Sequence, residues 1–121
     1  MSDVPESLEH MLAAWNERTP SRVRAHLNQA LSPEVRFVDP SIDVIGIDGF
    51  EANVHEVHQQ NPGAVYSRAS KVDSQHGFHR YHWAIHTAAG DLLLKGFDVV
   101  ETDSDRLVRC VIGFFGELRP D

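Results

Sequence analysis

The stretch VRFVDP, residues 35–40, alternates apolar and polar side chains in the way that a β-strand does. Val35, Phe37 and Asp39 therefore point to the same face of that strand, which places a carboxylate at the end of an apolar face. Pro40 has no N–H to donate to a neighbouring strand, so the strand is expected to end at Asp39. This stretch alone leaves two interpretations of Asp39 open: a proton-transfer base at the mouth of a pocket, or a cap for the turn that follows.

Two helices are expected before this strand. The first runs from about residue 5 to about residue 18 and has one apolar stripe with the i, i+3, i+4, i+7 spacing of a helix. The stripe consists of Leu8, Met11, Leu12 and Trp15. Thr19 and Pro20 suit the N-cap and the first position of a second helix, which ends before Ser32-Pro33. Its inward side chains are Val23, Leu27 and Leu31.

A third helix is expected after a loop at residues 41–46. Asp48 and Glu51 have the spacing of a capping box at its start. The helix should stop at the sequence NPG, residues 61–63, because proline and glycine both interrupt helices. Its inner face carries Phe50, Val54 and Val57.

The pattern changes to strands from residue 64 onward. The expected strands cover residues 64–73, 78–87, 92–102 and 106–115, with turn-forming residues between them. Joined in order, they make a four-stranded antiparallel meander. Helices segregated against one curved sheet define an α+β fold, and a length of 121 residues suits one domain, residues 1–121.

A four-residue turn at residues 88–91 sets the pairing of two of these strands. It predicts the facing pairs Thr87–Leu92, Ile85–Leu94, Trp83–Gly96, Tyr81–Asp98 and His79–Val100, which share one face of the sheet. Gly96 opposite Trp83 leaves space for the indole itself or for a ligand. Asp98 is then a buried carboxylate beside Tyr81, with a pKa raised by desolvation. The alternative is a core aspartate that only holds Tyr81 in place.

The opposite face of the same two strands has a mixed composition. It carries Arg80, His82, Ala84 and His86 against Leu93, Lys95, Phe97 and Val99. This mixture is too apolar for a fully solvated surface and too polar for a core, so it predicts a homodimer through the sheet. A partly exposed sheet face of a monomer is the alternative.

The charge pattern argues against several classes of partner. The formal net charge is −7 and the basic residues form no cluster, which disfavours nucleic acids and anionic membranes. No apolar run approaches the roughly 20 residues that span a bilayer. Cys110 is the only cysteine, so no intrachain disulfide can form, and the N-terminus lacks the pattern of a signal peptide. These features predict a cytoplasmic protein.

Four short pieces in this order resemble the nuclear-transport-factor-2-like (NTF2-like) superfamily, which includes ketosteroid isomerases and SnoaL-like polyketide cyclases. The pieces are AAWN at residues 13–16, VDP at 38–40, Gly46 with Gly49-Phe50, and GFFG at 113–116. The resemblance covers roughly residues 8–117 and implies a cone-shaped, cystatin-like fold: a curved antiparallel sheet with the three N-terminal helices packed on its concave face.

The resemblance also implies roles for individual residues. The isomerase pattern places its catalytic base in an Asp-Pro like that of Asp39, and a protonated, hydrogen-bond-donating acid where Asp98 lies. The tyrosine that completes the oxyanion hole in the family aligns with Met11, so a donor there would have to come from Tyr81 or Trp15.

These observations lead to three hypotheses. In the first, the protein is a cofactor-free isomerase- or cyclase-type enzyme for a small apolar carbonyl compound. Asp39 takes a proton, and Asp98 with Tyr81 stabilises the enolate. The residues expected to contact the substrate are Met11, Trp15, Phe37, Phe50, Val54, His79 and Trp83. The second hypothesis is a non-catalytic module that binds a hydrophobic ligand, and the third is an interaction protein that works through its sheet.

A metal site is not predicted. His55 and His58, close to Glu51, miss the His-Glu-x-x-His spacing of a zinc site by one residue. The sequence also lacks a phosphate-binding glycine loop, a nucleophile elbow and a dinucleotide fingerprint.

Overall fold

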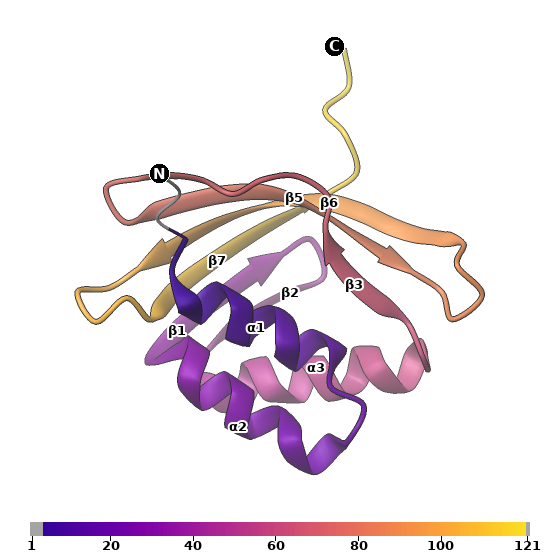
Figure 1. The fold of residues 1–121 in the computed structure, drawn as a ribbon, viewed down its shortest axis with the longest axis horizontal. Coiled ribbons are helices and arrows are strands. Elements are labelled where there is room, and N and C mark those ends of the chain that lie inside the picture. The colour runs from indigo at the N-terminus through magenta and orange to yellow at the C-terminus, as the bar shows by residue number, and fades with distance from the viewer. Residues whose placement is uncertain (1–3, 121) are drawn as a thin grey trace.

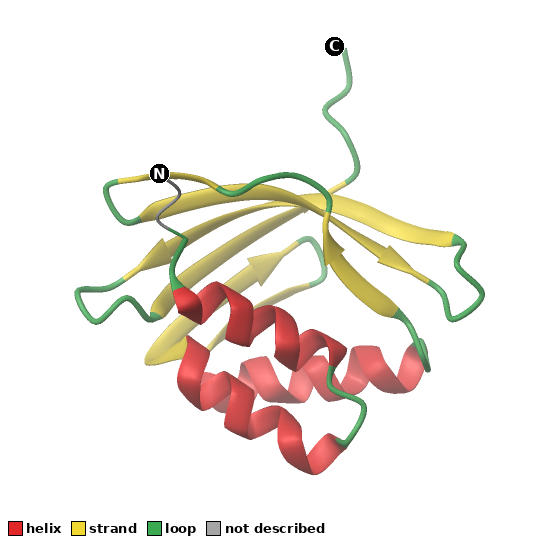
Figure 2. Ribbon diagram, viewed as in Figure 1, coloured by secondary structure: helices red, strands yellow, loops and turns green. Residues whose placement is uncertain are grey.

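Three helices pack against one face of a curved, seven-stranded sheet in the computed structural model, which describes residues 4–120 (Figures 1 and 2). The helices are α1 (Glu6–Asn16), α2 (Pro20–Ala30) and α3 (Ile47–Gln60). The strands are β1 (Leu31–Asp39), β2 (Ile42–Ile45), β3 (Val65–Arg68), β4 (Asp73–Gln75), β5 (Phe78–His86), β6 (Leu92–Thr102) and β7 (Val108–Phe115). The α+β architecture with the helices on the concave face is confirmed.

The strand order in the sheet is β2-β1-β7-β6-β5-β3, and β4 pairs with another part of β5. The predicted meander is confirmed, since β3, β5, β6 and β7 pair antiparallel in turn. One pairing differs: β1 lies parallel to β7. A parallel pair requires a long crossover, and here everything between the two strands serves as that connection. Local turn signals could not indicate it.

Two strand boundaries differ from the expectation. The segment predicted as a loop, residues 41–46, contains β2, which returns along β1 after a tight turn and pairs Asp39 with Ile42. Of the strand predicted over residues 64–73, only Val65–Arg68 form a strand, β3, whereas β4 begins at Asp73 and extends into the segment predicted as a turn. Between them the Ser70 hydroxyl accepts a hydrogen bond from the amide of His82 at 2.9 Å, so a side chain takes over from the backbone ladder of β5.

The helix ends also differ in detail. α3 begins one residue before the predicted cap, and Gly46 occupies the N-cap position with φ of 96°, a conformation that favours glycine. Asp48 is therefore not the cap and instead accepts a hydrogen bond from Arg24 at 2.7 Å. Thr19 is at the N-cap of α2 as predicted, although its side chain makes no capping hydrogen bond. α2 ends at Ala30, and Leu31 already belongs to β1.

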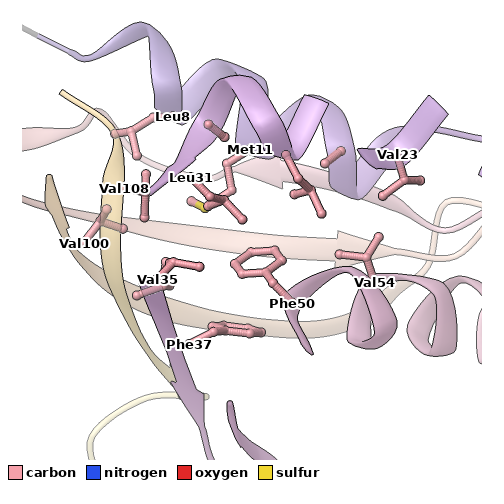
Figure 3. Close-up of a cluster of buried hydrophobic side chains, with 14 of the residues drawn as sticks. Leu8, Met11, Val23, Leu31, Val35, Phe37, Phe50, Val54, Val100 and Val108 are labelled. Carbon is pink, nitrogen blue, oxygen red and sulfur yellow. The ribbon is translucent and has the colours of Figure 1, made fainter. Parts of the chain in front are cut away.

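The hydrophobic core lies between the helices and the concave face of the sheet (Figure 3). It joins side chains from all three helices to strands β1, β5, β6 and β7. Phe50 of α3 is fully buried and stacks on Phe37 of β1, with ring centroids 4.8 Å apart. The stripe predicted for the strand at residues 35–39 therefore faces the core, with Val35 and Phe37 inside and Asp39 at its end.

The predicted register between β5 and β6 is confirmed for the four pairs from Ile85–Leu94 to His79–Val100. Only the turn differs: His86, rather than Thr87, faces Leu92, after a bulge. Gly96 is needed because the indole of Trp83 lies across it. A Cβ at position 96 would be 2.2 Å from Cζ2 of Trp83 and 2.2 Å from the carbonyl oxygen of Phe114. The indole, not a ligand, fills the space that the glycine leaves.

Candidate functional site

A cavity of about 400 Å³ lies between the helices and the concave face of the sheet. This is near the lower end of the volumes of small-molecule sites, roughly 300–1,000 Å³. Its wall is mainly apolar. Eight of the residues predicted for the site lie on it: Met11, Trp15, Phe37, Asp39, Phe50, Tyr81, Trp83 and Asp98.

Asp98 is the most perturbed acid of the cavity. Its Oδ2 accepts a hydrogen bond from the Tyr81 hydroxyl at 3.1 Å, and its Oδ1 accepts one from the Trp83 indole N–H at 2.9 Å. Burial raises the pKa of Asp98 to about 7, the charge of Asp39 acts in the same direction, and the two hydrogen bonds oppose the rise. The predicted rise of this pKa is confirmed. Burial, followed by the neighbouring charge of Asp98, also raises the pKa of Tyr81 well above its ordinary value.

Asp39 caps a turn, as one of its two interpretations predicts, and it also lies on the cavity wall. Its Oδ1 accepts hydrogen bonds from the amide and the hydroxyl of Ser41, each at 2.7 Å, so the carboxylate caps the turn to β2. The same side chain lies on the cavity wall. Its Oδ2 has no hydrogen-bond partner among residues 4–120, which leaves that oxygen free to accept a proton.

Gly113 allows the two acids to share one space. Asp98 faces Gly113 across β6 and β7, and the pairing of Val38 with Ile112 puts Asp39 beside the same glycine. A Cβ at position 113 would lie 3.0 Å from Oδ1 of Asp98 and 3.3 Å from Cβ of Asp39. Sequence reasoning missed this role of Gly113. Part of this role could have been predicted from the turn between β6 and β7, because that turn determines which residue of β7 faces Asp98.

Aromatic rings form much of the remaining wall. Trp15 stacks on Tyr66 with ring centroids 5.0 Å apart and meets Phe37 edge-on at 6.2 Å. Burial raises the pKa of Tyr66 to about 12. Its hydroxyl is buried and has no hydrogen-bond partner within the described part of the chain. Tyr66 was not predicted as a site residue, although it lies two residues from Arg68 and shares the concave face of β3 with it.

Two predicted site residues lie away from the cavity wall. Val54 is fully buried in the core of α3. His79 shares the face of Tyr81 but lies nearer the end of the sheet. There its Nδ1 is 2.7 Å from the Ser74 hydroxyl and its Nε2 is 3.1 Å from the Thr102 hydroxyl. Alternation along a strand gives the face of a side chain, but it cannot separate the cavity from the core on that face.

The histidines of α3 form structural contacts. His55 lies 3.0 Å from Glu51, which also accepts a hydrogen bond from Arg24 at 2.9 Å. Nε2 of His58 is 2.7 Å from the carbonyl oxygen of Trp15. Over residues 4–120 no group of three or more His, Cys, Asp or Glu side chains is placed to hold a metal ion. Nor does any helix in that range have the length and apolar character to cross a membrane.

Comparison with known proteins places the fold and the family. No family model and no curated protein matches the sequence. Among solved structures, a proposed isomerase of the SnoaL-like family from Agrobacterium tumefaciens is 30% identical, with a TM-score of 0.86 over 93% of this chain and 96% of that one. The chain therefore belongs to the SnoaL-like family, within the NTF2-like superfamily.

More distant structures share the fold alone. An NTF2-like protein of unknown function from Exiguobacterium is 20% identical, with a TM-score of 0.75 over 93% of this chain and 99% of that one. A proposed SnoaL-like polyketide cyclase from Jannaschia is 13% identical, with a TM-score of 0.71 over 95% of this chain and 89% of that one. The cystatin-like cone implied by the sequence pieces is confirmed.

Proposed function

We propose that the cavity catalyses proton transfer next to the carbonyl group of a small, mainly apolar molecule, using only side chains of this chain. The supporting observation is the pair of carboxylates, Asp39 and Asp98, in different environments on one apolar wall. Environments that separate the pKa values of two acids allow one to act as a base and the other as a neutral hydrogen-bond donor. The relationship to a proposed isomerase of the same family points in the same direction.

Proton abstraction is assigned to Asp39. Its Oδ2 takes a proton from the carbon next to the carbonyl, the C–H electron pair forms the new C=C bond, and the carbonyl π electrons move onto oxygen. The hydrogen bonds from Ser41 to Oδ1 hold the carboxylate in place during this step. Returning the proton to another carbon of the same molecule completes an isomerisation. Attack by the enolate carbon on a second carbonyl carbon of that molecule gives a cyclisation instead: the π electrons of that carbonyl move onto its oxygen, which takes the proton from Asp39.

Stabilisation of the enolate oxygen is assigned to Asp98 together with Tyr81. Below about pH 7 a neutral Asp98 can donate its proton in a hydrogen bond, either to the enolate or to the Tyr81 oxygen, which frees the phenol proton for the enolate. Trp83 fixes the Asp98 carboxyl through its indole N–H. Met11 brings no donor to the wall, and in this proposal Asp98 and Tyr81 supply the hydrogen bonds instead.

Deuterium exchange tests this function. Incubating the protein in D2O with cyclohexanone, butyrophenone and a β,γ-unsaturated ketone should exchange protons next to the carbonyl faster than buffer does, as read by NMR. The alternative is a non-catalytic module for hydrophobic ligands, which the absence of a donor at Met11 favours. It predicts that these ketones raise the melting temperature without any catalysed exchange, and that result would refute the enzymatic proposal.

We also propose that the outer face of the sheet packs against a second copy of the chain. Ile112 and Phe114 are 38% and 56% exposed there. Cations on this face already pair with acids, such as Arg36 with Asp43 and Arg80 with Asp73, so two copies of the face meet without net repulsion. Sedimentation equilibrium should find a dimer that Phe114→Lys dissociates. A monomer at all concentrations would contradict this assembly.

A further inference from the structure

Arg68 is the one cationic side chain on the cavity wall within the described residues. It is the last residue of β3 and pairs in register with Trp83, so it points to the concave face. The arginine side chain is 22% exposed, so most of it is withdrawn from solvent. A half-enclosed guanidinium on an apolar wall is a candidate for recognition of an anion.

The guanidinium keeps hydrogen-bonding capacity to spare. Its Nη2 alone contacts Glu9 of α1, at 2.8 Å from Oε1 and also against Oε2. The Nε and Nη1 atoms carry three further N–H donors, and none of these has an acceptor among residues 4–120. Glu9 is 52% exposed and belongs to a surface ion pair, a kind of contact that contributes little to stability. Arg68 can therefore bind an anionic group of a ligand, either while it keeps its contact with Glu9 or in place of that contact.

Arg68 lies at some distance from the two acids on the same wall. In the strand order, β5 separates β3 from β6, so Arg68 is two strand spacings of about 4.8 Å each from the strand of Asp98. Trp83 lies between them, next to Arg68 by register and bonded to Asp98 by its indole N–H. A molecule that spans the cavity can therefore contact the acids with one end and Arg68 with the other.

We propose that the ligand of this cavity carries a carboxylate, which Arg68 binds, at the end opposite its carbonyl group. This inference deepens the proposed function and rests on it for the role of the carbonyl end. An ionised Asp39 repels a ligand carboxylate and Arg68 attracts it, so the charges also determine the orientation. That orientation brings the carbonyl to Asp39 and Asp98.

A matched pair of ligands tests the proposal through binding, independently of turnover. The pair is 4-oxo-4-phenylbutanoate and butyrophenone, which share the aryl ketone and differ by a carboxylate in place of a methyl group. Calorimetry should find the carboxylate bound at least about tenfold more tightly by the wild-type protein, the scale of a charge-assisted hydrogen bond. Arg68→Gln should abolish this preference with little change in butyrophenone affinity, Arg68→Lys should retain part of it, and Glu9→Gln should increase it.

Arg80→Gln is the matched control, because Arg80 pairs with Asp73 and is 65% exposed on the outer face. It should leave the preference unchanged. If the ion pair between Arg68 and Glu9 were only structural, Arg68→Gln would lower stability but leave the ratio of the two ligand affinities as in the wild type. That outcome overturns the proposal. So does failure of the carboxylate to bind. A protein that binds the carboxylate through Arg68 without catalysing exchange would refute only the catalytic function.

Discussion

Asp39→Asn is expected to slow the exchange of protons next to a ketone carbonyl by about 10²–10⁴-fold, the usual contribution of a general base. The amide has no basic oxygen of comparable strength, but it keeps the size of the carboxylate and its Oδ1 can still accept hydrogen bonds from Ser41. The turn to β2 should therefore persist. Exchange in D2O followed by NMR measures the rate, and calorimetry with butyrophenone measures whether affinity stays within a factor of a few.

Asp43→Asn is the control for this experiment. Asp43 lies on β2, four residues further along the chain, and forms an exposed ion pair with Arg36 away from the cavity wall. It should leave the exchange rate unchanged. Equal rates for Asp39→Asn and the wild type would remove Asp39 from the mechanism.

Asp98 is expected to make stability fall as the pH rises. Its pKa is about 7 in the folded protein and about 3.9 in an unfolded chain. The raised folded pKa favours folding fully below about pH 4, and this contribution is lost as the pH rises to about 7. Each unit of pKa difference corresponds to about 1.36 kcal/mol, so the whole effect is on the order of 4 kcal/mol.

The comparison with Asp98→Asn isolates this effect. The variant cannot ionise, its carbonyl oxygen can accept the Trp83 N–H, and its amide can donate to the Tyr81 oxygen. Stability is measured by urea unfolding at about pH 5 and about pH 8. Subtracting the stability of the variant from that of the wild type cancels the contributions of histidines and other acids. The stability of the wild type relative to the variant should fall by about 3 kcal/mol across that range, because about two pH units of it lie below the folded pKa. A constant difference would mean that Asp98 is ionised throughout.

The residues that the sequence placed correctly are those governed by local rules. Two-residue alternation put Val35, Phe37 and Asp39 on one face, and one turn fixed the pairing of Tyr81 with Asp98. Both results needed only neighbouring residues and a short connection. The same rules predicted the meander and all three helices to within a few residues.

The features that were missed depend on contacts distant in sequence. The parallel pairing of β1 with β7 brings Asp39 beside Gly113, and no turn joins those strands. Arg68 was missed because its strand was expected to continue to residue 73. The strand ends at Arg68, and this places the side chain at the edge of the cavity. His79 and Val54 were assigned to the site from their faces, whereas neighbouring elements cover them. Faces follow from periodicity, but the boundary between core and cavity depends on the whole fold.

The protonation state of Asp98 tests the central claim most directly, since the mechanism requires a neutral acid beside an ionised one. Carboxyl ¹³C NMR of protein labelled at aspartate, with Asp98→Asn used to assign the signal, follows this group through a pH titration. The Asp98 signal is expected to titrate with a midpoint near 7. A midpoint near 4 would mean an ionised Asp98 at neutral pH, which cannot donate a hydrogen bond to an enolate and would contradict the proposed chemistry.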